Sequence, residues 1–368
     1  MKAVALVGGQ GTRMRPLTFT TPKPLLPLCQ RPLIWYTVER CKTAGIEELI
    51  LSTGYKPQLF ETVVGDRVED VKISYVHETD PLGTAGGAKN CEALLDSTFI
   101  VFNGDVLTSV DLSDLIRTHE STGASVTIYL TEVEDPREYG VVPTAETGEV
   151  LDFIEKPSLE EAPTNFVNGG IYVIERDILA LIPEGVPYSF ERELFPKLLE
   201  DGVLVVGYKS SSYWLDVGTP AKYLQAHNDL MSGRLHVQPP GTESDGLYFL
   251  GEAYISPDAE VVGPVVIGDG VRVESEVSIK GPVSIGPDSR IEGPSQITRS
   301  VLLGGNSVGR NSVVEDSILG ERAEIASDCL VSEFAVIGAG ALVGSGNELR
   351  RGMRVWPGVE VEDSAIKF

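Results

Sequence analysis

Apolar runs alternate with helical patterns over about the first 235 residues of the chain. Short apolar runs bounded by glycine or polar residues predict strands over residues 3–7, 48–52, 71–77, 99–103, 125–132, 150–154, 170–174 and 203–208. Apolar positions at helical spacing predict helices over residues 32–44, 84–95, 188–199 and 220–231. This alternation favours an α/β domain with a Rossmann-like, mostly parallel sheet and helices on both faces.

Apolar residues recur every six positions in the last part of the chain. Two runs keep this spacing without a miss: Ile255, Val261, Ile267, Val273, Ile279, Ile285, Ile291 and Ile297, and then Leu319, Ile325, Val331, Ile337, Val343, Leu349, Val355 and Val361. The two runs are out of phase, so the register must shift somewhere in residues 298–318. A six-residue apolar repeat is typical of a parallel β-helix, in which each hexad forms one side of a triangular coil.

A change of composition separates the two patterns. Residues 238–246 read Gln-Pro-Pro-Gly-Thr-Glu-Ser-Asp-Gly, which contains no apolar residue and several residues that break regular structure. We therefore predict an α/β domain over residues 1–237, a linker over 238–247 and a β-helix over 248–368. No apolar stretch reaches the ~20 residues that span a bilayer, and the N-terminal apolar run is too short for a signal peptide. We expect a cytoplasmic protein.

The overall charge excludes some classes of partner. The chain has 30 Lys and Arg against 54 Asp and Glu, a formal net charge of −24. This surplus disfavours binding to nucleic acids or to an anionic membrane surface. The four cysteines are scattered without a Cys-x-x-Cys spacing, so neither a zinc knuckle nor a disulfide framework is indicated. If the substrates are anionic, local cations or a divalent metal ion must offset the charge of the whole protein.

The densest chemical signal directly follows the first predicted strand. Residues 8–11 read Gly-Gly-Gln-Gly, a turn in which backbone N–H groups can approach a polyphosphate. The turn is not a Walker A loop, because no Gly-Lys-Ser/Thr follows. It is not a dinucleotide-binding fingerprint either, because Met14 stands where a third glycine is needed. Arg13, Arg15 and Lys23 add cations that can neutralise phosphates.

The extended motif, Gly-Gly-x-Gly-Thr-Arg-x-x-Pro-Leu-Thr followed by Pro-Lys-Pro, resembles the signature of the sugar-nucleotide pyrophosphorylases. The resemblance covers nearly all of the chain, including a C-terminal hexapeptide left-handed β-helix. Further motifs stand in the family's order: Pro-Leu-Gly-Thr-Ala-Gly at 81–86, Asn-Gly-Asp at 103–105, Tyr-Gly-Val-Val at 139–142, Glu-Lys-Pro at 155–157, Asn-Gly-Gly at 168–170 and Trp-Leu-Asp-Val-Gly at 214–218. The most similar branch is that of the mannose-1-phosphate guanylyltransferases with a β-helix tail.

The resemblance implies a reaction and a set of site residues. A sugar 1-phosphate oxygen attacks the α-phosphorus of a nucleoside triphosphate, and pyrophosphate leaves without a covalent enzyme intermediate. Arg13 is implied for the β- and γ-phosphates, Lys23 for the α-phosphate, and Asp105 and Asp216 for Mg²⁺, a cation that prefers oxygen ligands. The positions implied for the nucleotide are Leu6, Gly8, Gly9, Gly11, Thr12, Gly83 and Thr84. Those implied for the sugar phosphate are Gly140, Glu155, Lys156 and Asn168.

Taken singly, these residues have ordinary structural explanations. Asp105 is also explained as a turn residue and Asp216 as a helix cap, and Asn168 stands in a sequence typical of turns. Their joint order is what favours a functional site.

The substrates implied by the most similar branch are GTP and mannose 1-phosphate. A glucose-1-phosphate thymidylyl- or uridylyltransferase remains an alternative, because base choice depends on few contacts. A non-catalytic, sugar-nucleotide-sensing subunit is a second alternative, which the intact Arg13, Lys23, Asp105 and Asp216 oppose. A hexapeptide acyltransferase is a third, and it is opposed because residues 237–368 contain no histidine.

The β-helix is therefore expected to serve structure and self-association, which predicts a homo-oligomer. We expect Trp356 and Phe368, close to the C-terminus, to cap the last coil or to pack against a neighbour, since the sides and ends of the stacked coils are available to a partner.

Overall fold

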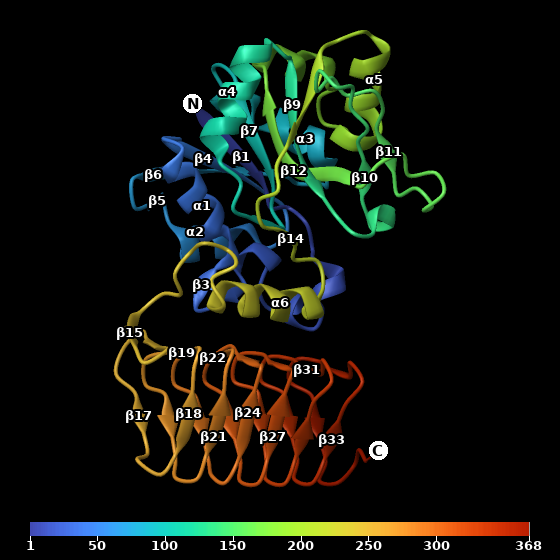
Figure 1. Ribbon diagram of the computed structural model, residues 1–368. Helices are drawn as coiled ribbons and strands as arrows, with labels where there is room; N and C mark the ends of the chain where they lie inside the picture. Colours follow the sequence, from blue (N-terminus) through green and yellow to red (C-terminus); the bar gives the residue numbers. More distant parts are fainter. Residues whose placement is uncertain (368) are drawn as a thin grey trace. The chain divides into compact units, whose positions relative to one another are not determined.

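The computed structural model describes residues 1–367, so Phe368 lies outside the described residues. The described chain divides into two compact units (Figure 1). The first consists of Met1–Gln10 and Ile34–Asp216, and the second of Gly11–Leu33 and the chain from Val217 onward. The predicted boundaries at residues 237 and 248 stay a prediction, because the compactness of a unit does not say which parts of the chain fold alone.

The first unit is built on one mixed sheet with the order β11-β10-β12-β7-β1-β4-β6-β5, in which β9 and β13 extend from β12. Its strands are β1 (Lys2–Leu6), β4 (Glu48–Thr53), β5 (Arg67–Val68), β6 (Val71–His77), β7 (Phe99–Asn103), β9 (Val126–Glu132), β10 (Gly140–Val141), β11 (Ile154–Glu155), β12 (Phe166–Ile174) and β13 (Val205–Lys209). The strands β7, β1, β4 and β6 run parallel to one another, as the strand–helix alternation predicts. Nearly continuous apolar strands such as β7 are buried over their length, because both faces of the sheet are covered.

The α-helices of the chain are α1 (Leu33–Thr43), α2 (Pro57–Val64), α3 (Gly83–Asn90), α4 (Leu112–Thr122), α5 (Phe195–Glu200) and α6 (Pro220–Met231). The helix predicted over residues 188–199 is wrong in its first half. Residues Phe190–Leu194 form a π-helical turn, in which the Leu194 N–H donates to the Ser189 carbonyl. Pro196 explains the change, because it has no N–H to continue an α-helical ladder through this segment.

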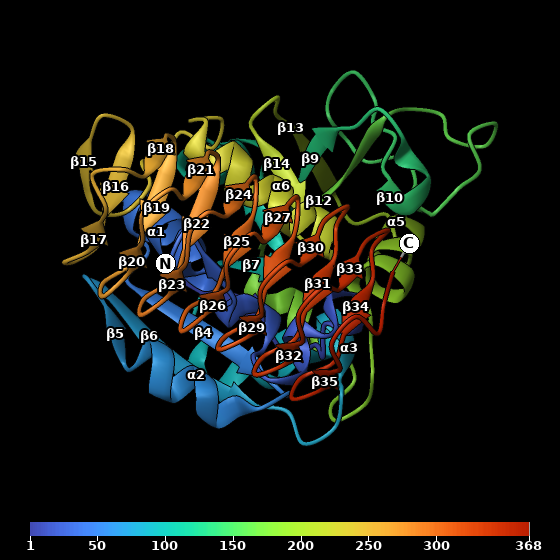
Figure 2. The same cartoon turned by 90° about the horizontal axis from the view of Figure 1, so that it is seen from below.

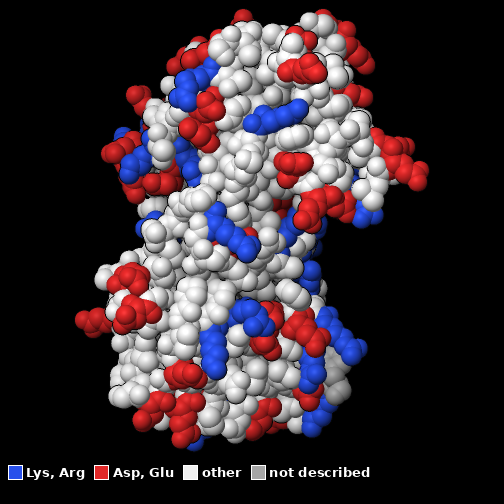
Figure 3. Space-filling model, viewed as in Figure 1, with Lys and Arg blue, Asp and Glu red and all other residues white. Residues whose placement is uncertain are grey.

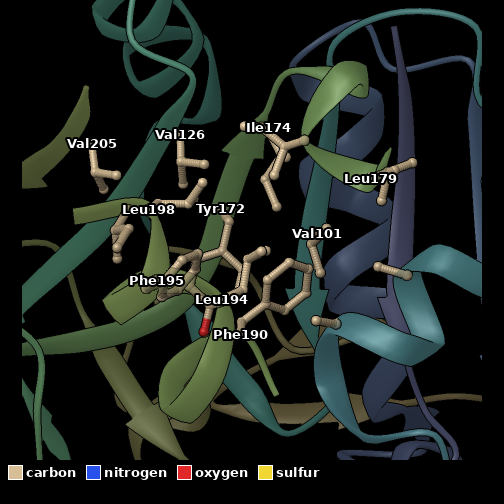
Figure 4. Close-up of a cluster of buried hydrophobic side chains, with 14 of the residues drawn as sticks. Val101, Val126, Tyr172, Ile174, Leu179, Phe190, Leu194, Phe195, Leu198 and Val205 are labelled. Carbon is tan, nitrogen blue, oxygen red and sulfur yellow. The ribbon is translucent and has the colours of Figure 1, made fainter. Parts of the chain in front are cut away.

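A cluster of buried side chains fixes that turn in the core of the first unit. The ring of Tyr172, on β12, lies 5.3 Å from the ring of Phe190 and 5.1 Å from that of Phe195. Figure 4 shows these rings together, with Val126 and Val205 of neighbouring strands beside them. The π-helical turn is therefore anchored at both ends by aromatic packing.

The second unit contains the β-helix, which consists of three sheets whose strands run parallel, apart from the first strand, β15 (Thr242–Ser244), which pairs antiparallel with β16 (Leu247–Phe249). Its first sheet contains β15, β16, β19 (Val265–Ile267), β22 (Val283–Ile285), β25 (Val301–Leu302), β28 (Ile318–Leu319), β31 (Val336–Ile337) and β34 (Arg354–Val355). The second contains β17 (Tyr254–Ile255), β20 (Arg272–Val273), β23 (Arg290–Ile291), β26 (Ser307–Val308), β29 (Glu324–Ile325), β32 (Leu342–Val343) and β35 (Glu360–Val361). The third contains β18 (Glu260–Val262), β21 (Ser278–Lys280), β24 (Gln296–Thr298), β27 (Val313–Glu315), β30 (Leu330–Val331) and β33 (Glu348–Leu349). Figure 2 shows the strands of successive coils side by side in rows.

The six-residue repeat is confirmed, and the phase shift has a local cause. The predicted inward positions from Ile267 to Ile297 and from Leu319 to Leu349 are fully buried or nearly so. Between the two runs, Ile285 pairs with Leu302 and Leu302 with Leu319, so these coils have 17 residues. One side of each of these two coils therefore has five residues instead of six, which moves the apolar pattern.

Two further differences from the predicted elements are small. The strand predicted over residues 150–154 reduces to β11 and an isolated bridge between Val150 and Thr144, with Leu151 exposed between them. The predicted linker contains β15, which pairs with β16 and begins the first sheet of the β-helix.

Acidic side chains occur in several separate groups on the face of each unit seen in Figure 3.

Candidate active site

The first unit brings the ends of β1 and β7 together. Leu6 pairs with Asn103 at the ends of these parallel strands, and the next N–H, that of Gly104, donates to the Leu6 carbonyl at 3.1 Å. A Cβ atom at Gly104 would lie 2.4 Å from that carbonyl oxygen, so only glycine allows this close approach. The chain then turns at Asp105, at the edge where open α/β sheets bind ligands.

Two carboxylates that are far apart in the sequence are adjacent here. The strand β8 (Val106–Thr108) pairs antiparallel with β14 (Trp214–Asp216), and the register places Val106 opposite Asp216. Asp105 precedes Val106 directly, so both carboxylates lie at the same end of this two-stranded ladder. Among residues 1–367, no group of three or more Asp, Glu, His or Cys side chains is arranged to hold a metal ion. Two carboxylates suit a Mg²⁺ ion that takes its other ligands from phosphates and water.

A cavity of about 400 Å³ lies at this edge. It brings together seven of the residues named from the sequence. It is lined by Gly83, Thr84, Asn103, Asp105, Val106, Glu138, Tyr139, Gly140, Glu155, Asn168, Gly170, Ser189, Glu191, Arg192, Trp214 and Asp216. The lining is rich in carboxylate, amide and hydroxyl groups, so it suits a polar ligand with many hydroxyls rather than an apolar one.

A β-bulge shapes one wall of the cavity. The register between β12 and β9 shifts between Asn168 and Tyr172, and Gly170 takes a positive φ of 73°. The Asn168 side chain holds the bulge, because it accepts from the Gly170 N–H at 2.9 Å and donates to the Tyr172 hydroxyl at 2.7 Å. The Trp214 indole N–H donates to the Gly169 carbonyl at 3.0 Å. Bulges next to binding sites redirect side chains, and this one turns Asn168 and Gly170 into the cavity lining.

Glu191 and Arg192 are lining residues that sequence reasoning missed. The Glu191 carboxylate accepts three hydroxyl hydrogen bonds, from Thr84 at 2.8 Å, Ser189 at 2.7 Å and Tyr172 at 2.9 Å. Burial and the nearby Glu191 charge raise the pKa of Tyr172 well above its usual value, so its hydroxyl stays a donor. In the sequence, Ser189 followed by glutamates is typical of a helix start, and Ser189 does cap the π-helical turn. Because this pattern is common at helix starts, the sequence gives no sign that Glu191 lines a cavity.

Lys156 is not brought into the cavity lining, although its neighbour Glu155 is. Lys156 is exposed, takes a positive φ of 50°, and donates its backbone N–H to the Tyr139 carbonyl at 3.0 Å. Two of its neighbours, Tyr139 and Glu155, belong to the lining, so Lys156 lies next to the cavity without lining it.

The glycine-rich turn begins in the first unit and continues in the second. Gly8 follows β1 and accepts the Tyr55 N–H at 3.2 Å, and a Cβ atom there would lie 3.3 Å from the Gly54 nitrogen. From Gly11, with a positive φ of 59°, the chain enters the short 3₁₀ turn Thr12–Met14. The Thr18 hydroxyl donates to the Gly11 carbonyl at 2.8 Å and stabilises the turn.

The candidate cations of this segment differ in exposure. Arg13 is exposed, whereas Lys23 is half-buried and begins the third 3₁₀ turn of this segment, Lys23–Leu25. A polyanion that binds this segment therefore has direct access to the Arg13 guanidinium.

The cysteines do not form a nucleophilic site. Cys29 Sγ lies 3.6 Å from His227 Nδ1, but both residues are buried in the second unit. Burial raises the pKa of the Cys29 thiol and lowers the pKa of His227 to about 3, so the pair is neutral. Burial likewise raises the pKa of Cys91 to about 12. A reactive thiolate requires the opposite shift.

Comparison with known proteins now decides the family. The family model described as nucleotidyl transferase matches residues 2–233, and that described as GMPPB C-terminal domain matches residues 261–367. The chain belongs to the nucleotidyl transferase family. This nucleotidyl transferase is therefore an enzyme that transfers a nucleotidyl group, as the resemblance in its motifs implies.

Individual relatives of this nucleotidyl transferase differ in the base they are named for. It is 44% identical over 276 residues to a mannose-1-phosphate guanylyltransferase of Mycobacterium tuberculosis, covering 74% of this chain and 76% of the relative. It is 34% identical over 364 residues to a UTP–glucose-1-phosphate uridylyltransferase of Synechocystis, covering 93% and 90%. The crystal structure of HddC from Yersinia pseudotuberculosis, complexed with GMP-PN, shares 28% identity with a TM-score of 0.54, covering 61% and 97%.

One further property concerns membranes. Within the described part of this nucleotidyl transferase, no helix has both the length and the apolar character needed to cross a membrane.

Proposed function

We propose that this enzyme transfers a guanylyl group from GTP to mannose 1-phosphate and releases pyrophosphate. The observation that carries the proposal is the cavity in which the Asp105–Asp216 pair faces hydroxyl-binding groups. A sugar 1-phosphate has an anionic phosphate at one end, which a metal ion on the two carboxylates would bind, and hydroxyl groups at the other end. The 44% identical relative is named for this reaction, and a model described as GMPPB C-terminal domain matches the β-helix.

The proposed chemistry is positioning and charge stabilisation, because phosphoryl and nucleotidyl transfer need no covalent enzyme group. Arg13 would bind the leaving β- and γ-phosphates, and Lys23 would bind the α-phosphate. Asp105 and Asp216 would hold a Mg²⁺ ion, which offsets phosphate charge when it is bound. The oxygen of the sugar phosphate can then approach the α-phosphorus opposite the leaving pyrophosphate.

The remaining residues would bind the two substrates. The backbone of the glycine-rich turn offers N–H groups to the triphosphate. The positions assigned to the nucleotide are Leu6, Gly8, Gly9, Gly11, Thr12, Gly83 and Thr84. Glu155 and Asn168 would bind sugar hydroxyls beside Gly140, and Lys156 would reach from its exposed turn to the sugar phosphate. Glu191 joins this set, because its carboxylate is held at the cavity wall by three hydroxyl groups.

Replacing Glu191 with glutamine tests its role in sugar binding. Glutamine keeps the shape of the side chain but places an amide N–H against hydroxyl groups that donate to the carboxylate in the wild type. We therefore expect the KM for mannose 1-phosphate to rise about 10-fold. The KM for GTP should change by less than about 2-fold on the same reasoning. Glu200→Gln, an exposed position on α5, is the charge-matched control. An unchanged KM for mannose 1-phosphate would remove Glu191 from the sugar site.

The substrate pair is tested by a panel of GTP, UTP and dTTP against mannose 1-phosphate and glucose 1-phosphate, with pyrophosphate release measured. Guanine presents an N1–H and an exocyclic amine that pyrimidines lack, so a matched pocket discriminates strongly. We expect kcat/KM to be highest for GTP with mannose 1-phosphate, by about 10-fold or more. The uridylyltransferase relative supplies the specific competing result. A preference for UTP with glucose 1-phosphate would overturn the guanylyl assignment, and no turnover with any pair would favour a sensing subunit.

We further propose that the enzyme acts in the cytoplasm as a homo-oligomer that associates through its β-helix. Exposed apolar side chains there, including Val262 and Tyr254, are compatible with such contacts. Sedimentation equilibrium of the intact chain measures the association, and a monomer at all concentrations would contradict it.

A further inference from the structure

The segment that carries Arg13 and Lys23 belongs to the same compact unit as the β-helix. Residues 11–33 group with the β-helix and α6 rather than with the mixed sheet that β1 belongs to. The Gln30 side-chain amide donates to the Ser284 hydroxyl of β22 at 3.2 Å. Further along the first sheet of the β-helix, a small cavity is lined by Leu17, Thr20, Thr21, Leu26, Pro27, Leu303, Gly320, Glu321 and Ala339. The segment therefore lies along successive coils of the β-helix.

The coil that contains β34 holds the backbone of the 3₁₀ turn. The Arg354 guanidinium donates to the Arg15 carbonyl at 2.8 Å and, more weakly, to the Arg13 carbonyl at 3.4 Å. These carbonyls flank the C-terminal end of the turn Thr12–Met14, where helical carbonyls need outside partners. A charged donor makes a stronger hydrogen bond than a neutral one.

The same coil makes a second, aromatic contact with the segment. The Trp356 ring packs edge-to-face on the Phe19 ring, with centroids 5.1 Å apart and an angle of 86°. The Arg15 guanidinium lies over the Phe19 ring, 4.7 Å from its centroid. This arrangement is a favoured geometry for aromatic pairs and for a cation on a ring. Trp356 thus packs against another segment of its own chain.

We propose that Arg354 and Trp356 are positioning residues, which hold residues 11–19 in the conformation that binds the triphosphate. Glycine at 11 gives this segment backbone freedom, and a free loop would lose conformational entropy each time it closed on a nucleotide. Contacts at Arg15 and Phe19 order the loop beforehand. The β-helix then acts in nucleotide binding as well as in assembly. The proposal rests on the nucleotide-binding role proposed for Arg13 and Lys23.

The proposal predicts different effects on the KM values for the two substrates. Loss of either contact leaves the cavity of the first unit unchanged, so binding of the sugar phosphate should not alter. A loosened phosphate loop should raise the KM for the nucleoside triphosphate and lower kcat, because small displacements of a charge-stabilising group cost much of its effect. A purely structural role would instead lower thermal stability and affect both substrates equally.

The test uses Arg354→Ala and Trp356→Ala in the intact chain, with Trp356→Phe as the conservative variant. Arg290→Ala and Phe334→Ala are matched controls, because both are exposed side chains of the same β-helix outside this contact. Backbone hydrogen exchange is measured without substrates, followed by KM for GTP, KM for mannose 1-phosphate and kcat.

We expect faster exchange within residues 11–19 in the two alanine variants and not in the controls. The KM for GTP should rise about 10-fold, with the KM for mannose 1-phosphate within 2-fold and Trp356→Phe close to wild type. Unchanged exchange, or an equal rise of both KM values, would overturn the proposal. Faster exchange with an unchanged KM for GTP and an unchanged kcat would overturn the positioning role alone and leave the proposed function standing. A wild-type enzyme that transfers no nucleotidyl group would overturn the proposed function and, with it, this role.

Discussion

Asp105→Asn is expected to lower kcat by at least about 10²-fold, the largest effect of any single substitution in the cavity. The β8–β14 register places Asp105 beside Asp216, so one lost charge removes half of the carboxylate pair that is available for Mg²⁺. The fold should persist, because asparagine has the same size and suits turns equally well. The measurement is the initial rate of pyrophosphate release across a Mg²⁺ titration.

A metal-binding readout separates this effect from a general loss of activity. Mn²⁺ binding in the presence of a nucleoside triphosphate, followed by electron paramagnetic resonance, should weaken in Asp105→Asn. Asp96→Asn is the control, because Asp96 pairs with Lys2 at the opposite end of β1 and is exposed. Near-wild-type turnover and unchanged Mn²⁺ binding in Asp105→Asn would show that the carboxylate pair does not hold the metal.

Arg13→Ala and Lys23→Ala are each expected to lower kcat by about 10²-fold, the scale of losing one preorganised charge contact in a transition state. The two cations follow a glycine-rich turn in a chain with a net charge of −24, so we expect them to supply the local positive charge that a triphosphate requires. The Tm should change little for Arg13→Ala, since this side chain is exposed. Steady-state kinetics and a thermal unfolding curve of each variant check both statements.

Lys42→Ala is the control for these two substitutions, because Lys42 lies on α1 and forms an exposed ion pair with Glu69. If Arg13→Ala and Lys23→Ala both turn over as fast as Lys42→Ala, the glycine-rich turn is not the phosphate site. A rise confined to the KM for GTP, with kcat unchanged, would show that the cations bind the ground state and the transition state equally.

Periodicity predicted most of the fold, because burial imposes it directly. The six-residue repeat requires one inward side chain on each side of a coil. Side chains at the repeat positions, such as Ile267 and Ile337, are therefore buried in the interior. The position of the register shift could not be predicted, since a side of five residues differs from one of six only in a loop residue. The π-helical turn before Phe195 was missed for a similar reason: Pro196 breaks the ladder, but packing decides what replaces it.

Residues of the candidate site were predictable where they belong to a continuous sequence motif. Asp105 comes just after β7 and Asn168 lies within β12, both stand in short motifs, and the structure brings both to one cavity. Glu191 was not predictable, because its role as a lining residue depends on hydroxyls contributed by Thr84 and Tyr172, which are distant in the sequence. The contact of Arg354 with the 3₁₀ turn spans 339 residues and has no local signal at all.

The most direct test of the account follows the phosphorus atoms in a single reaction. The intact enzyme is incubated with GTP, mannose 1-phosphate and Mg²⁺, and the products are resolved by ³¹P NMR. Direct transfer to the sugar phosphate predicts a nucleoside-diphosphate sugar and pyrophosphate in equal amounts, and neither of them when the sugar phosphate is omitted. Pyrophosphate release without the sugar phosphate, or orthophosphate as the main product, would contradict direct transfer to the sugar phosphate.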